Sequence, residues 1–281
     1  MLTISDIADV VELRTWANDS PYSSSALKED LQAALEGNEM KDAERYARET
    51  FEEIATRANA LPEAYPFAFD GVTLTPNELK TSSAYLFCLC LSFFDNIPLR
   101  IRSVEFEALA TTAAEKYFCG KAIRIGAPWR TATITDYEVL LKMVSSLIPD
   151  IGPPVQKSAP AGGDAGWDIV VVNNFKDRKF SRVIALGNCA TGRTNWIGKG
   201  METFPTYFWE FFRKSPETRN ACVTFLAVPF VMTDEERVRK TAATCITFDR
   251  FRICEYAPVT TAAAMRWVEK QRAKALDVPF A

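Results

Sequence analysis

The spacing of apolar residues changes along this chain of 281 residues, and the change limits the folds open to it more than any other feature. In the first third, apolar residues recur every three or four positions, which is typical of one face of a helix. The region 43–61 shows this spacing most clearly, through Ala43, Ala47, Phe51, Ile54, Ala58 and Leu61. After residue 165 the period shortens toward two, as it does in strands. The two patterns together predict an α/β fold.

Turn residues divide the chain into predicted elements. Helices are expected over residues 27–35, 43–61, 77–94, 103–118, 136–147, 234–240 and 261–275, with a short aromatic helix after Pro205. Strands are expected over residues 123–128, 168–172, 182–186, 222–228 and 245–248. Residues 151–164 are rich in Pro, Gly, Ala and Ser, which indicates a long loop. We therefore expect a helical N-terminal region over residues 1–100, followed by a sheet-containing domain over residues 101–281.

The chain contains no histidine, and this excludes many enzyme classes. Ser-His-Asp hydrolases, Cys-His proteases and His-ligated zinc enzymes all need imidazole. An enzyme built from this sequence must rely on carboxylates, Lys, Cys, amides or a metal held by oxygen. The 33 Lys and Arg residues against 36 Asp and Glu give a net charge of −3. A surface that is basic throughout is not indicated, although a local basic patch is compatible with this balance.

The cysteines and the longest apolar run bear on the cellular compartment. The seven cysteines form no CxxC pair, and most lie in apolar surroundings, as in the segment 86–91. Reduced core cysteines of a cytoplasmic protein are the simplest explanation. The N-terminus has neither the basic nor the apolar segment of a secretory signal. The longest apolar run, 84–94, falls short of the ~18 residues of a membrane helix, so no membrane partner is expected.

The densest group of polar residues flanks the two strands predicted over 168–172 and 182–186. Asp168 opens the first of these strands, Asn188 closes the second, and Lys199 follows in the next segment. If the two strands form an antiparallel hairpin, the start of one lies beside the end of the other, so Asp168 and Asn188 should be neighbours. A carboxylate and an amide oxygen can hold a hard divalent cation, and a lysine can orient water. Each residue also has a plain structural explanation, in a turn or on a solvated surface.

The motifs around this hairpin resemble those of the restriction-endonuclease-like (PD-(D/E)XK) superfamily. Gly-Asp-Ala-Gly-Trp-Asp at 163–168 precedes one strand, and Asn-Cys-Ala-Thr-Gly at 188–192 with Asn-Trp-Ile-Gly-Lys at 195–199 follows the next. The motif is similar to that of bacterial defence nucleases with Gln-Cys-Ala-Thr-Gly. The resemblance covers residues 101–255 and implies a mixed sheet flanked by helices.

The resemblance also implies roles for individual residues. Asp168 and Asn188 would bind Mg²⁺ (or Mn²⁺), with Glu107 as a third ligand from the preceding helix. The position of the usual lysine is Ala190, and Lys199 is the candidate replacement.

The resemblance implies that the chain is a DNA endonuclease. In its active form the chain would hydrolyse phosphodiester bonds in anti-phage defence, with DNA as substrate, and a homodimer or a protein partner in a defence complex is compatible with it. Asn in place of Gln and Ala190 in place of Lys favour the alternative, a catalytically inactive nuclease fold that binds DNA or serves as an assembly subunit.

Basic residues cluster near the predicted hairpin and are candidates for contact with DNA phosphates. They are Lys176, Arg178, Lys179, Arg182 and Arg193. Arg124 and Arg130, which flank a Gly-Ala-Pro segment, are further candidates. A solvated turn explains the same cluster without any ligand.

The segment 187–194 also scans as GxxxxG-Arg-Thr, close to a phosphate-binding loop. Such a loop needs a lysine at the position that Arg193 occupies here. The second motif of such proteins is an apolar strand that ends in an acid, and the candidate for it, residues 230–235, directly follows the strand-breaking Pro229. Nucleotide binding is therefore the weaker interpretation.

Overall fold

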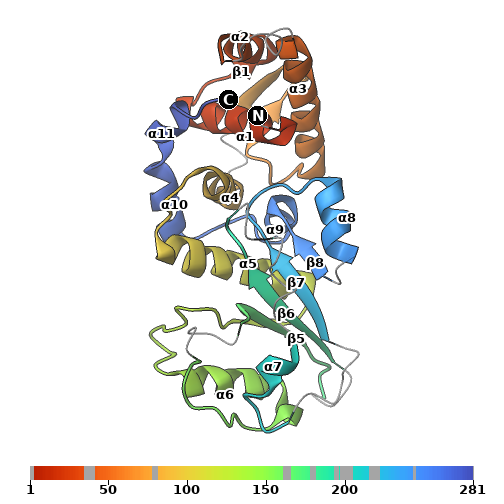
Figure 1. The fold of residues 1–281 in the computed structure, drawn as a ribbon, viewed down its shortest axis with the longest axis vertical. Coiled ribbons are helices and arrows are strands. Elements are labelled where there is room, and N and C mark those ends of the chain that lie inside the picture. Colours follow the sequence, from red (N-terminus) through yellow and green to blue (C-terminus); the bar gives the residue numbers. More distant parts are fainter. Residues whose placement is uncertain are drawn as a thin grey trace. The chain divides into compact units, whose positions relative to one another are not determined.

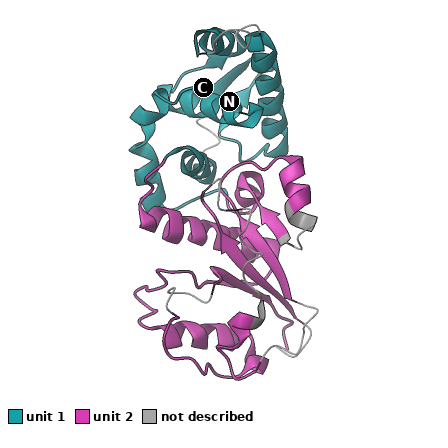
Figure 2. Ribbon diagram, viewed as in Figure 1, with its two compact units in different colours: residues 1–94, 258–281 teal, residues 95–257 magenta. Residues whose placement is uncertain are grey.

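The computed structural model describes residues 3–34, 42–77, 82–160, 166–177, 182–192, 196, 205–214, 222–242 and 245–280. Within these ranges, the side chains are described at all positions except 205, 206, 240–242 and 245. The chain divides into two compact units (Figure 2). Unit 1 comprises residues 1–94 and 258–281, and unit 2 comprises residues 95–257. The sequence pattern predicts one domain over residues 101–281. The division differs because the last helices pack with the N-terminal ones, a contact that no local pattern reveals.

Unit 1 combines helices with a small antiparallel sheet (Figure 1). Its helices are α1 (Ile4–Asn18), α2 (Ser24–Ala34), α3 (Ala43–Ala60), α4 (Ser83–Phe93), α10 (Ala262–Glu269) and α11 (Arg272–Leu276). Its strands are β1 (Tyr22–Ser23), β2 (Phe67–Phe69) and β3 (Thr73–Pro76), in the order β1-β3-β2. Helix α1 and this sheet were not expected from the sequence. The expected final helix is interrupted between α10 and α11.

A buried ionic network lies inside unit 1. Nη1 of Arg57 lies 2.6 Å from Oδ1 of Asp9 and 3.1 Å from Oε1 of Glu12, and all three side chains are fully buried. Tyr65 and Tyr85 donate hydrogen bonds to the Glu12 carboxylate, at 2.8 and 3.0 Å. Because buried charges are tolerated only with such partners, Arg57 ties helix α3 to helix α1.

Unit 2 is built on a mixed five-stranded sheet in the order β4-β5-β6-β7-β8. The strands are β4 (Lys121–Arg124), β5 (Ile169–Asn173), β6 (Val183–Cys189), β7 (Cys222–Ala227) and β8 (Cys245–Phe248). Strand β5 pairs antiparallel with β4 and β6, and β7 runs parallel to β6 and β8. The predicted hairpin is confirmed: β5 and β6 pair from Ile169↔Gly187 to Asn173↔Val183.

Helices cover both faces of this sheet (Figure 1), as predicted for a mixed sheet flanked by helices. The helical elements of unit 2 are the π-helical turn Arg100–Glu105, α5 (Phe106–Tyr117), α6 (Tyr137–Leu147), the 3-10 turn Pro149–Ile151, α7 (Pro205–Trp209), α8 (Asp234–Ala242) and α9 (Arg250–Tyr256). On one face, Val170 and Leu186 pack into a core with Leu140 and Phe208 from α6 and α7.

The other face of the sheet packs against α5 and α9. There, the ring of Phe225 lies against Phe118 at the end of α5 and against Phe248 of β8, with ring centroids 5.7 and 5.4 Å apart. Helix α9 was not expected from the sequence, whereas the boundaries of α3, α6 and β8 agree with the prediction to within about one residue. None of the described helices has the length and hydrophobicity needed to span a bilayer.

Candidate functional site

Two carboxylates from different elements converge on Gly126. Glu107 lies in the first turn of α5, and Asp168 immediately precedes β5. A methyl group placed on Gly126 would lie 2.5 Å from Oε2 of Glu107 and 2.6 Å from Oδ1 of Asp168. The two carboxylate oxygens are therefore separated by no more than the sum of these distances. The structure thus brings Glu107 and Asp168 together beside Gly126, where a larger residue would collide with both carboxylates.

Three adjacent strands hold Asp168 in place. Its backbone carbonyl accepts hydrogen bonds from the N–H groups of Ile125 at 2.7 Å and Gly126 at 3.0 Å, both just beyond β4. Its Oδ2 accepts a hydrogen bond of 2.7 Å from the N–H of Cys189, at the end of β6. The expected meeting of the start of one hairpin strand with the end of the other is therefore confirmed. This fixed backbone directs the second carboxylate oxygen, Oδ1, toward Gly126.

Glu107 is buried, with 5% of the residue exposed, and it has a cationic neighbour. Nη1 of Arg124 lies 2.9 Å from its Oε2, and the two side chains are 11% and 7% exposed. The same guanidinium donates to the carbonyl oxygens of Gly126 at 2.8 Å and Pro128 at 2.6 Å. A buried carboxylate needs such a partner because desolvation disfavours its charge. With two acids and one arginine, the formal charge of this group is negative.

Asn188 and Ala190 lie on the strand beside Asp168. Asn188 is buried at 4% exposure, and it is the next residue beyond the pair Ile169↔Gly187, as Asp168 is on the other strand. In the period-two series of β6 it follows Ile184 and Leu186, which face α6 and α7. Contact between its amide and the Asp168 carboxylate stays a prediction. Ala190 is buried in a separate apolar cluster with Leu226.

The basic residues predicted to contact DNA lie in different settings. Lys176 is exposed beyond the end of β5, and Arg130 is exposed with its guanidinium over the Trp129 ring. Lys199, Arg178, Lys179 and Arg193 lie outside the described residues.

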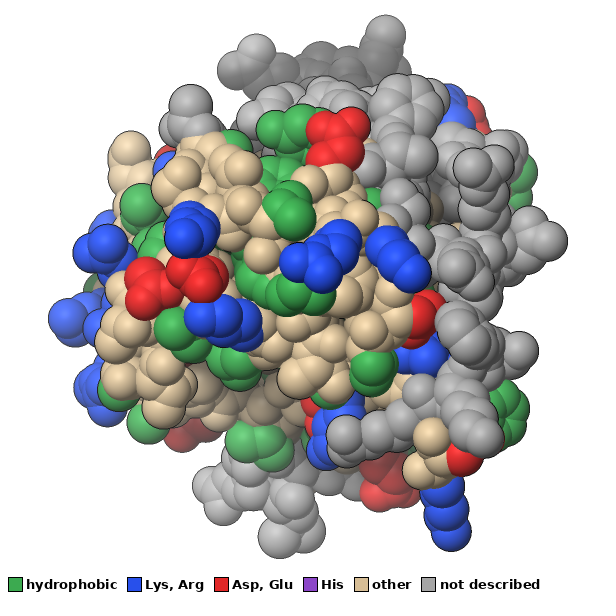
Figure 3. All heavy atoms as spheres, turned by 90° about the horizontal axis from the view of Figure 1, so that it is seen from below, with side chains coloured by type: hydrophobic (Ala, Val, Ile, Leu, Met, Phe, Trp, Pro, Cys, Tyr) green, Lys and Arg blue, Asp and Glu red, His purple; other side chains and the backbone are tan. Residues whose placement is uncertain are grey.

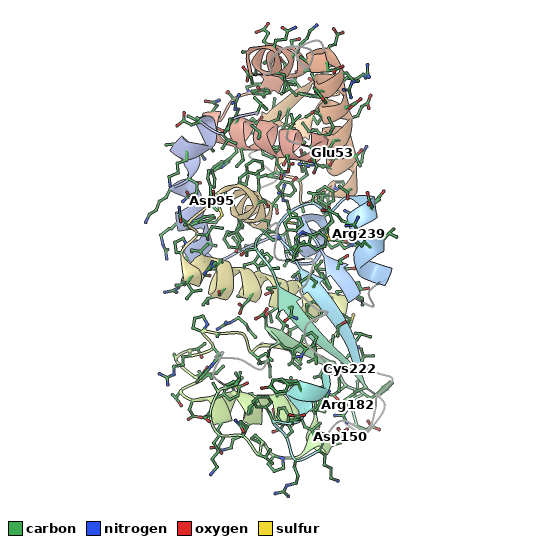
Figure 4. All side chains as sticks on the ribbon, viewed as in Figure 1. Glu53, Asp95, Asp150, Arg182, Cys222 and Arg239 are labelled. Carbon is green, nitrogen blue, oxygen red and sulfur yellow. The ribbon has the colours of Figure 1, made fainter. Side chains whose placement is uncertain are left out.

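The prediction that Arg182 contacts DNA phosphates requires a correction, because this residue is not on the surface. Figure 4 labels its side chain and that of Asp150. Nη2 of Arg182 lies 3.0 Å from Oδ1 of Asp150, and the two side chains are only 2% and 9% exposed. Arg182 adjoins β6, and the turn Pro149–Ile151 supplies a buried acid for it, so this guanidinium is not accessible to phosphate. On the face of unit 2 in Figure 3, the visible basic side chains are interspersed with acidic and hydrophobic ones.

The phosphate-binding-loop interpretation is wrong. Gly187, which would open that loop, lies inside β6 and pairs with Ile169 on one side and Phe225 on the other. A strand in the middle of a sheet uses its backbone N–H groups in the ladder, so they cannot cradle a phosphate. The supposed second motif also fails, because β7 ends at Ala227 and Asp234 begins helix α8.

The carboxylate pair fits a hard divalent cation. Mg²⁺ is commonly bound through one or two protein carboxylates together with substrate phosphates and water. Glu107 and Asp168 supply two such oxygens, and both lie close to the Cα side of Gly126, which has no side chain of its own to displace them. In the part of the chain that the structure describes, no group of three or more His, Cys, Asp or Glu residues is placed to hold a metal. A cation here would therefore depend on amide, backbone or substrate oxygens for its remaining ligands.

Sequence reasoning missed the partnership of Arg124 with Glu107 and the importance of Gly126. From the sequence alone, Arg124 is a candidate only for contact with DNA phosphates, as a basic residue beside a Gly-Ala-Pro segment. Its role depends on the pairing of β4 with β5, where Arg124 lies opposite Ile169. This pairing joins segments more than forty positions apart, and the sequence carries no local signal for it.

Comparisons with known proteins give little further guidance. No protein-family model and no curated protein matches the chain. Among solved structures, MspJI restriction endonuclease in complex with a 27-mer oligonucleotide aligns with a TM-score of 0.31 and 13% sequence identity. The alignment covers 73% of this chain and 38% of that one. A similarity of this strength does not assign the chain to a family.

Proposed function

We propose that this chain is a metal-dependent DNA endonuclease that hydrolyses phosphodiester bonds. The observation that carries the proposal is the convergence of Glu107 and Asp168 on the space left by Gly126. The order β5, β6, α7, β7 supports it, because it repeats the strand–strand–helix–strand part of the order behind the resemblance to restriction-endonuclease-like enzymes, while β4 and α6 lie between α5 and this part.

In this proposal each residue has a defined task. Asp168 and Glu107 hold Mg²⁺ or Mn²⁺, with Asn188 as a further oxygen ligand. The bound cation supplies Lewis-acid polarisation of a phosphoryl oxygen. Lys199 orients the attacking water or the phosphate, as the resemblance implies.

The remaining roles concern substrate and setting. Lys176, Arg178, Lys179 and Arg193 contact the DNA backbone. A role in anti-phage defence, with a homodimer or a protein partner, is part of the proposal and follows from the resemblance alone. A cytoplasmic location is also proposed, and it follows from the cysteine pattern.

A second candidate function is a nuclease fold that binds DNA without cleaving it. One observation favours it. The position at which related motifs carry lysine is Ala190, which is buried at 6% exposure among apolar side chains. No lysine can act from that position, so cleavage requires Lys199 or another cation to replace it.

Cleavage of supercoiled plasmid in Mg²⁺ or Mn²⁺ separates the two functions. We expect wild type to nick or linearise the plasmid, and Asp168→Asn to lower the rate on the order of a hundredfold or more, because it removes an anionic ligand at almost constant shape. Asp95→Asn makes the same chemical change at an exposed position of unit 2 and should leave the rate unchanged. DNA binding without cleavage by wild type, in either cation, would establish the non-cleaving function instead.

A further inference from the structure

Arg124 contacts the same carboxylate oxygen that the proposed cation would use. Its Nη1 lies 2.9 Å from Oε2 of Glu107, the oxygen that would also lie nearest to a Cβ atom at Gly126. The guanidinium is held there by two backbone carbonyls, those of Gly126 and Pro128. It is therefore a fixed positive charge beside the carboxylate pair.

A fixed positive charge at this place has two opposite effects on the site. It stabilises the buried Glu107 carboxylate when no other cation is present. It also repels a divalent cation that approaches the same oxygen, and this repulsion is strong where water is largely excluded. Arginine keeps its charge at every accessible pH, so the effect persists under all ordinary conditions.

We propose that Arg124 is a positioning residue that sets the cation affinity of the Glu107–Asp168 pair. It holds the Glu107 side chain in place in the cation-free protein, and it weakens cation binding, so that tight binding requires further anionic oxygens such as those of a DNA phosphate. This inference rests on the proposed function, because it concerns the same site. It links cation binding to the presence of substrate.

Titration of the full chain with Mn²⁺ in the absence of DNA tests this inference, with free Mn²⁺ followed by its electron paramagnetic resonance signal. Arg124→Gln removes the charge and keeps a hydrogen-bond donor, and we expect it to bind Mn²⁺ about tenfold more tightly than wild type. Arg124→Lys keeps a charge but loses the planar fork that reaches three acceptors, and its affinity should fall between the two. Thermal melts of each variant establish that it is folded.

The outcomes separate this inference from the proposed function. If wild type binds Mn²⁺, Asp168→Asn does not, and both Arg124 variants bind no more tightly than wild type, the inference is wrong and the cation site stands. Binding by an Arg124 variant but not by wild type supports the inference. If neither wild type nor any Arg124 variant binds Mn²⁺, the cation site and the inference both fail. Should Arg124→Gln not fold, the affinity of Arg124→Lys relative to wild type decides the question.

Discussion

Gly126 allows a direct test of the arrangement of Glu107 and Asp168, because any side chain at this position must displace them. The substitution Gly126→Ala places a carbon 2.5 Å from Oε2 of Glu107 and 2.6 Å from Oδ1 of Asp168. Neither carboxylate yields easily, since Arg124 holds the first and the N–H of Cys189 holds the second. Overpacking of this kind costs about 1–3 kcal/mol.

The free energy of unfolding also contains a smaller opposing contribution. Replacing glycine with alanine restricts the unfolded chain and stabilises the fold by about 0.4–1 kcal/mol where the backbone allows it. The expected net loss is about 1–2 kcal/mol, which corresponds to a fall in Tm of about 2–8 °C for a domain of this size. Because the carboxylates must move apart, Mn²⁺ affinity should fall as well.

Gly192→Ala is the matched control, because a methyl group there would meet no atom within 4 Å. Its Tm should stay within about 2 °C of wild type. The assays are thermal unfolding followed by circular dichroism, and Mn²⁺ titration. A Gly126→Ala variant with the Tm and the Mn²⁺ affinity of wild type would refute the convergence of the two carboxylates on this position.

Two further predictions concern groups outside the carboxylate site. Arg57→Met should destabilise the fold by about 3–5 kcal/mol, because it leaves the carboxylates of Asp9 and Glu12 buried without their cation. The exposed Arg48→Met should cost less than about 0.5 kcal/mol, and equal Tm values for the two variants would contradict the role given to the network. Burial raises the pKa of the Cys222 thiol from its ordinary value of 9.0 to about 11. The rate of its alkylation by iodoacetamide, followed by peptide mass spectrometry, should therefore still rise about tenfold between pH 9 and pH 10. A rate that levels off near pH 9 would contradict the burial of this thiol.

Local patterns in the sequence account for the elements that position Asp168. The period of two residues on either side of a charged turn predicts the hairpin of β5 and β6, and an antiparallel hairpin brings Asp168 to the end of β6. This follows because both signals, alternation and turn, lie within about twenty residues. The amphipathic spacing in the N-terminal region likewise predicts α3, whose boundaries agree with the structure.

Contacts between distant segments could not be read in this way. The pairing of β4 with β5 places Arg124 and Gly126 in the site, and it depends on which strand docks at the sheet edge. The assignment of residues 258–281 to unit 1 depends on the packing of α11 on α1. The burial of Arg182 depends on Asp150, an acid in a turn more than thirty residues away. In each case the deciding interaction is tertiary, and neither residue type nor periodicity specifies its partner.

The central claim is that Glu107 and Asp168 together bind one divalent cation. Crystals grown with Mn²⁺ and measured near the manganese absorption edge test it most directly, because the anomalous difference map locates the ion itself. We predict a peak about 2.1 Å from both Oε2 of Glu107 and Oδ1 of Asp168. A map with no peak beside these two oxygens, at Mn²⁺ concentrations that support cleavage of DNA, would contradict the claim.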